Sequence, residues 1–193
     1  MKILKWLGIG AGAMIVVLLA VGFALDSHIE LHLDKTVQGD ADRMYALVSS
    51  PAGVKWWWAD AGVEYGKDVD NMTIEHKDGA SGPGAKVAFK VGGTLYEEWT
   101  LVSLKPGQEV VWGVDFQMFV VRRTLRLKRG EEGVAASWHE TGEVGNPLMR
   151  VMMKAMSTDE VLQNWDKALQ MLARRTQAKG FAALQLPAAA TAS

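Results

Sequence analysis

The sequence predicts an α+β fold in which a curved antiparallel sheet wraps around one long C-terminal helix. Two observations lead to this prediction. Residues 62–144 read as a run of about five or six strands joined by turns, without the helix-length connections that parallel strands need. Residues 158–179 then read as one long helix with a narrow apolar stripe, and such a helix has to lie against another surface.

The long helix has a clear start and a clear stop. Ser157, with Glu160 three residues later, forms a capping box that satisfies free backbone N–H groups. Gly180 suits the position after the helix, because glycine takes the left-handed backbone there without strain. A helix over 158–179 would be roughly 33 Å long, and a shorter helix is predicted before it over 147–156. The apolar stripe consists of Val161, Leu162, Trp165, Leu169 and Leu172.

The N-terminal segment, residues 1–25, is predicted to be a membrane anchor. An uncharged run covers residues 6–25, and about twenty such residues cross a bilayer core as a helix. Lys2 and Lys5 precede the run, and no Lys or Arg follows it until Lys35. The positive-inside rule then predicts a single-pass protein with a cytoplasmic N-terminus and a periplasmic or extracellular domain.

A cleaved signal peptide is the alternative for this segment. Residues 22–24, Gly-Phe-Ala, fit a cleavage site with small residues. The apolar region of a signal peptide is only about 7–15 residues long, however, and this run is longer. A retained anchor is therefore the preferred interpretation.

Composition limits the remaining choices. The chain has 193 residues, which suggests one domain, predicted over 26–180, followed by a disordered Ala-rich tail over 181–193. There is no Cys, so disulfides and thiolate metal sites are excluded, and a net charge of −1 argues against a nucleic-acid partner. Eight Trp and ten Met suit a wide apolar interior.

The domain is predicted to begin with a half-buried strand over 28–37, where apolar and polar residues alternate. Asp40 can cap a helix after it, and Pro51 ends that helix, because the residue before a proline avoids the α region. A second short helix or turn follows over 54–60. The later strands are predicted over 63–65, 72–76, 86–91, 94–104, 109–116, 119–128 and 134–144.

Several segments in this order resemble a known superfamily. The helix at Asp40–Leu47 precedes a Trp-rich turn, and Gly82-Pro83-Gly84-Ala85-Lys86-Val87 enters a middle strand. Leu104-Lys105-Pro106-Gly107 with Val111-Trp112 forms a central hairpin, and Trp138 to Gly142 is followed by Asn146-Pro147 and the long helix. From His28 to Lys179 the chain resembles the polyketide-cyclase/START-like superfamily with the helix-grip (Bet v 1-like) fold, in particular its membrane-anchored bacterial members.

The resemblance implies a cavity between the sheet and the long helix that often holds an apolar ligand. It carries over no set of catalytic residues. Trp99, Trp112 and Trp138 come from three predicted strands and Trp165 from the helix, so they line one space if they share the inner face. The alternative is that these side chains fill the space. The expected ligand-binding residues are Trp58, Glu97, Trp99, Trp112, Trp138, His139, Met152 and Trp165.

Polar residues near this space have two interpretations each. One of Glu97 and Glu98 must point inward, and a buried carboxylate would need a partner such as Arg122 or Arg123. His139 lies beside Glu140 and Glu143, which suits acid–base chemistry or, more often, a solvated pair on the outer face. One or two of the Trp residues at 56–58 are expected to close the core and one to lie at the surface; the alternative places one of them at the cavity mouth or near the membrane.

The sequence therefore favours a membrane-tethered, non-enzymatic binder of an apolar or amphipathic small molecule, with no catalytic residues, no metal and no cofactor. The segment His28-Ile-Glu-Leu-His32 does not match the zinc-protease motif, which has a different residue order and lies on a helix. Two alternatives stay open. One is an enzyme of the cyclase/dehydratase kind, and the other is an interaction module resembling the Hsp90-activator relatives of the fold, with an exposed apolar patch and little cavity.

Overall fold

The computed structural model describes the backbone of residues 2–61, 71–77, 79–178 and 181, and their side chains except those of residues 2–9, 11 and 59–61. The helices are α1 (Lys2–Ala24), α2 (Ala41–Val48), α3 (Pro51–Ala61), α4 (Pro147–Ala155) and α5 (Thr158–Thr176). The strands are β1 (His28–Val37), β2 (Met72–His76), β3 (Lys86–Val91), β4 (Thr94–Lys105), β5 (Glu109–Asp115), β6 (Val120–Gly130) and β7 (Gly133–Glu143).

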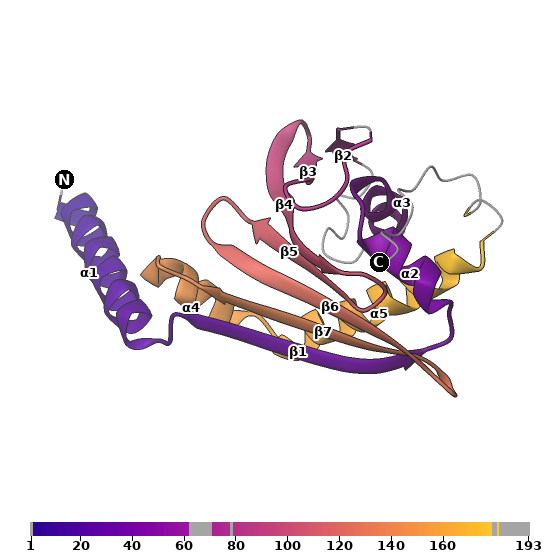
Figure 1. The fold of residues 1–193 in the computed structure, drawn as a ribbon. Coiled ribbons are helices and arrows are strands. Elements are labelled where there is room, and N and C mark those ends of the chain that lie inside the picture. Colours follow the sequence, from indigo (N-terminus) through magenta and orange to yellow (C-terminus); the bar gives the residue numbers. More distant parts are fainter. Residues whose placement is uncertain (1, 62–70, 78, 179–180, 182–193) are drawn as a thin grey trace.

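The strands form one antiparallel sheet in the order β1-β7-β6-β5-β4-β3-β2. Strands β2 to β7 follow one another as a meander, and β1 joins the far edge by pairing with β7 along its whole length. Helix α5 runs beside the long strands, α3 lies against β2 and β3 where the sheet curves over, and α2 packs against β5 and β6 (Figure 1). The predicted α+β arrangement, a sheet gripping a long C-terminal helix, is confirmed.

Local signals in the sequence explain where the helices begin. The Asp40 side chain accepts hydrogen bonds from the backbone N–H groups of Asp42 and Arg43, at 3.0 and 3.1 Å, and so caps α2. Asn146 caps α4 in the same way, and Ser157 accepts from the N–H of Glu160 to start α5. Of these capping residues, Asp40 and Ser157 are the ones that the sequence predicts.

The end of the long helix differs from the prediction. Helix α5 stops at Thr176 with Gln177 as its cap, earlier than the predicted end at residue 179. The Thr176 hydroxyl donates to the carbonyl of Ala173 at 2.6 Å, and the side chain of Gln177 donates to the Gln38 carbonyl. The first bond lies within α5, and the second connects the end of α5 to the segment between β1 and α2. The predicted strand at 63–65, Gly180 and nearly all of the tail lie outside the described residues.

The N-terminal segment forms helix α1 and leads directly into β1. Within the described part of the chain, no helix is both long and apolar enough to cross a membrane. The membrane anchor predicted over 1–25 is therefore not confirmed. The anchor, its topology and the domain boundaries remain predictions from the sequence.

Candidate ligand-binding site

Six Trp side chains meet between the sheet and the helices. They form the tryptophan cluster, which consists of Trp57 and Trp58 on α3, Trp99 on β4, Trp112 on β5, Trp138 on β7 and Trp165 on α5. Each is no more than 3% exposed. Ring centroids of contacting pairs lie 4.9–6.4 Å apart, and these contacts link all six rings into one network. The cluster occupies the space in which the sequence predicts a cavity.

The period-2 alternation of the strands brings these rings together. On β4 the side chains of Glu97, Trp99 and Leu101 are all buried, because every second residue faces inward. Helix α3 supplies two adjacent rings, since both Trp57 and Trp58 are buried while Trp56 is only half-buried. Of the one or two neighbouring Trp residues expected to close the core, two do so, and Trp56 lies partly at the surface.

A buried cation lies inside the cluster. The guanidinium carbon of Arg123 is 4.6 Å from the Trp99 ring centroid and 5.5 and 5.6 Å from those of Trp138 and Trp58. Its Nε donates to Oε2 of Glu140 at 2.6 Å, and both residues are buried. The aromatic faces and the carboxylate together compensate for taking the charge out of water.

The inward carboxylate on β4 is Glu97, which is fully buried. Its neighbour Glu98 faces the other way and pairs with Lys86 near the surface. Of the two candidate arginines, Arg123 is buried and Arg122 is exposed. The inward carboxylate is therefore Glu97 and the buried arginine is Arg123, whose ion pair described above is with Glu140.

Most indole N–H groups of the cluster have no acceptor in the part of the chain that the structure describes. The Nε1 atoms of five rings are buried without a hydrogen-bond partner among the described residues, namely Trp57, Trp58, Trp99, Trp138 and Trp165. Only the sixth is satisfied there, because Trp112 donates to the carbonyl of Val48 at 2.8 Å. A buried donor left without a partner costs about 1–3 kcal/mol. Each of these donors would therefore be stabilised by a hydrogen-bond acceptor placed within its reach.

Six of the eight predicted site residues lie together, and two do not. Met152 is on α4, outside the sheet, and is 60% exposed. His139 lies on the opposite face of β7 from Trp138, where its ring nitrogen is 3.2 Å from Glu30 and its ring centroid 5.6 Å from that of His32. The prediction did not include Trp57, Arg123 or Glu140. Strand parity could have added Glu140, because it shares a face with Trp138.

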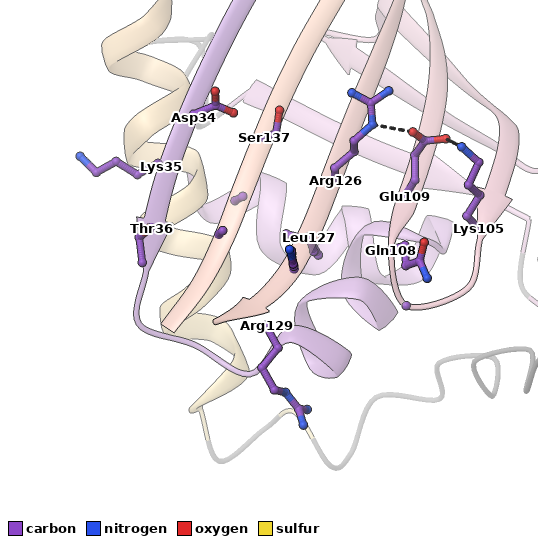
Figure 2. Close-up of a pocket in the computed structure, with 14 residues that line it drawn as sticks. Asp34, Lys35, Thr36, Lys105, Gln108, Glu109, Arg126, Leu127, Arg129 and Ser137 are labelled. Carbon is purple, nitrogen blue, oxygen red and sulfur yellow. Dashed lines mark hydrogen bonds and ion pairs between the residues drawn. The ribbon is translucent and has the colours of Figure 1, made fainter. Parts of the chain in front are cut away.

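A second hollow lies on the face of the sheet that bears His139. Figure 2 shows Asp34, Ser137, Arg126 and Glu109 side by side across neighbouring strands, in front of the helices. Its volume is about 870 Å³, and half of its fourteen lining residues are charged. Glu109 pairs with Lys105 at 2.8 Å and with Arg126 at 2.6 Å, and hydrogen bonds from these two residues lower its pKa.

Comparison with known proteins extends these observations. The chain matches neither a protein-family model nor a curated protein. Among solved structures, it is similar to ginseng major latex-like protein 151 from Panax ginseng, with a TM-score of 0.57 and 12% identity over 79% of this chain and 99% of that one. A protein of Chromobacterium violaceum gives a TM-score of 0.54 and 16% identity over 79% and 99%.

The di-domain ARO/CYC StfQ of the steffimycin biosynthetic pathway is also similar, with a TM-score of 0.51 and 10% identity over 79% of this chain and 52% of that one. At these identities the similarity establishes the fold alone. The sequence resemblance to the helix-grip (Bet v 1-like) fold is confirmed. These neighbours give no support for the membrane-anchored type.

Proposed function

We propose that this helix-grip domain binds an apolar small molecule that carries hydrogen-bond acceptors, between the sheet and α5 at the tryptophan cluster. The observation that carries the proposal is the set of five buried indole N–H groups without an acceptor among the described residues. A ligand oxygen placed among them would remove part of the cost of burying these donors. The similarity to an ARO/CYC of a biosynthetic pathway supports a small organic molecule as the ligand class.

The charged side chains in the cluster bear on the charge that a ligand can carry. Glu97 and Glu140 bring two carboxylates, and Arg123 brings one guanidinium, which is already held by Glu140. There is no excess of positive charge for a ligand anion, and burying an unpaired anion is costly. A neutral acceptor, such as a ketone oxygen on an aromatic or aliphatic ring system, fits better. Since the rings are in contact, the ligand enters by displacing side chains, and aromatic faces then cover it.

Two probes of nearly equal shape test this proposal. Fluorenone carries a ketone oxygen and fluorene does not, so the difference in their affinities measures the contribution of the acceptor. We expect fluorenone to bind several-fold more tightly, with a change in Trp emission and a negative heat-capacity change from apolar burial. If neither probe binds, or if both bind equally, the proposal is wrong.

Two matched variants identify the donors. Trp99→Phe removes an N–H that has no partner in the described structure, whereas Trp112→Phe removes one that already bonds to Val48. We expect the first change to reduce the preference for fluorenone over fluorene, and the second to leave that preference unaltered. A loss of preference in both variants would point to altered packing instead of hydrogen bonding.

Binding without chemistry is preferred to a cyclase-like reaction. The only histidine that the sequence places near the cavity, His139, lies on the outer face, and the buried Arg123 is fixed by Glu140. General acid–base catalysis needs a group within hydrogen-bond reach of the substrate, and His139 cannot reach the cluster through the sheet.

We also propose that residues 1–25 tether the domain to a membrane, with the N-terminus cytoplasmic and the domain periplasmic or extracellular. The uncharged run over 6–25 and the preceding Lys2 and Lys5 support this. Full-length protein should sediment with membranes and begin at Met1 or Lys2 on N-terminal sequencing. A first residue of Leu25 or Asp26 would show a cleaved signal peptide instead.

A further inference from the structure

Exposed apolar side chains gather at one end of the sheet. His28 of β1 pairs with Glu143, Glu143 with Val120, and Val120 with Asp115, so this row marks the end at which α1 enters the domain. The turn between β5 and β6 extends beyond the row. Met118 in this turn is 58% exposed, and Val120 at the start of β6 is 56% exposed.

Helix α4 lies at the same end (Figure 1) and contributes nothing to the core. None of its residues is buried. Leu148, Met152 and Met156 follow one another at intervals of four along one side, and they are 38%, 60% and 60% exposed. An amphipathic helix normally turns such a stripe toward the protein interior, whereas α4 presents it to the surroundings.

Contacts with α1 hold α4 in this position. A side chain at Gly22 would come within 2.1 Å of the Pro147 carbonyl oxygen, so the two helices touch backbone to backbone. Arg150 donates from Nε to the Val144 carbonyl at 2.7 Å, and its Nη1 lies 3.3 Å from the carbonyl of Leu25. The apolar stripe of α4 is therefore fixed next to the C-terminal part of α1.

The chemistry of α1 identifies what covers this surface. Its residues 14–17, Met-Ile-Val-Val, are consecutive and all exposed, so every side of the helix there is apolar. A protein partner would cover one side of such a helix, whereas lipid covers all sides at once. Lys154 on α4 is exposed and lies two residues from Met152, on the opposite side of the helix, as in interfacial helices that have an apolar face and a charged face.

We propose that α4 and the β5–β6 turn form a lipid-contacting surface, with α4 lying in the interface of the bilayer that receives α1. The inference rests on the proposed membrane tether, and it adds which end of the domain faces the lipid. It does not require α4 to cross the bilayer, because a helix with one apolar stripe lies in the interface plane.

The absence of native cysteine makes the test direct. Full-length single-cysteine variants Met152→Cys and Met118→Cys would carry an environment-sensitive dye in phosphatidylcholine/phosphatidylglycerol vesicles containing spin-labelled lipid. Glu131→Cys, in the exposed turn at the other end of β6, is the matched control. We expect a blue shift and at least two-fold quenching by the spin-labelled lipid at Met152 and Met118, and neither effect at Glu131.

The outcomes separate this inference from the tether itself. Protein that floats with vesicles while neither labelled position is quenched keeps the tether and overturns the lipid surface. Protein that does not float with vesicles overturns both. Shielding of the Met152 dye that depends on protein concentration and not on lipid would identify a second copy of the chain as the occupant, and would also overturn the inference.

Discussion

Trp138 on β7 and Trp165 on α5 stack on each other, with ring centroids 5.3 Å apart and planes 15° from parallel. Both rings are almost completely buried. The pair joins the long helix to the sheet and adds an aromatic contact to the burial of Leu169 and Leu172 on the same helix.

Truncating the helix side of this pair should be costly. We expect Trp165→Ala to lower the free energy of unfolding by about 3–5 kcal/mol, because large-to-small changes in a core lose burial and leave a cavity. Urea melts of the full chain and of Trp56→Ala, a half-buried control, measure the difference. A loss below about 1 kcal/mol for Trp165→Ala would contradict the burial of the stripe.

Removing the partner of the buried cation should also destabilise the domain. Glu140→Gln leaves the Arg123 charge buried without its carboxylate, which typically costs about 3–5 kcal/mol. The exposed pair of Lys86 and Glu98 is the matched control, and Glu98→Gln should cost less than about 1 kcal/mol. Similar losses in both variants would mean that Arg123 finds compensation elsewhere in the cluster.

The hollow on the outer face predicts a pH effect. Hydrogen bonds from Lys105 and then Arg126 hold the pKa of Glu109 below its ordinary value of 4.5. The unfolded chain therefore takes up this proton at a higher pH than the folded chain, and the contribution of Glu109 to stability is complete above pH 4.5. It is lost as the pH falls through the folded pKa.

Glu109→Gln should accordingly flatten the dependence of unfolding free energy on pH below about 4.5 and leave a constant deficit above it. Urea melts between pH 3 and 7 give this dependence. Glu131→Gln, in an exposed turn, should leave the acid slope of the wild-type protein unchanged. An unchanged slope in Glu109→Gln as well would show that its ion pairs are too well solvated to matter.

The outer position of His139 predicts that it has no role in binding. His139→Ala should leave the affinity for fluorenone within a few-fold of wild type, because Trp138 and His139 point to opposite faces of β7. Equilibrium dialysis at pH 7 measures this. Loss of the turnover of some compound in this variant would instead support the cyclase-like alternative.

The sequence predicts most of the fold because its signals are local. Strand alternation placed β1, β2 and β3 at their observed boundaries, and the capping residues Asp40 and Ser157 marked the starts of α2 and α5. The end of α5 was harder to predict, since Thr176 and Gln177 end the helix through contacts with residues far away in the chain.

The site could be predicted only in part. Strand alternation indicates which face of the sheet a side chain occupies, but not how much space other side chains leave there. Alternation places Trp99 and Trp138 inward, but it cannot reveal that rings from α3 fill the space between them. The exposure of Met152 was also beyond the sequence. In the sequence, an apolar helix stripe that is buried has the same pattern as one that is exposed. The contact of α4 with α1 determines that the stripe of α4 is exposed.

The pairing of β1 with β7 also determines how the domain responds to tension. All ten residues of β1 pair with β7, from His28 opposite Glu143 to Val37 opposite Val134. A pull on α1 along the direction of β1 loads these pairs together, in shear, instead of opening them one by one. If the chain is held through its N-terminal helix, a pulling force on the domain therefore acts on all ten residue pairs between β1 and β7 at once.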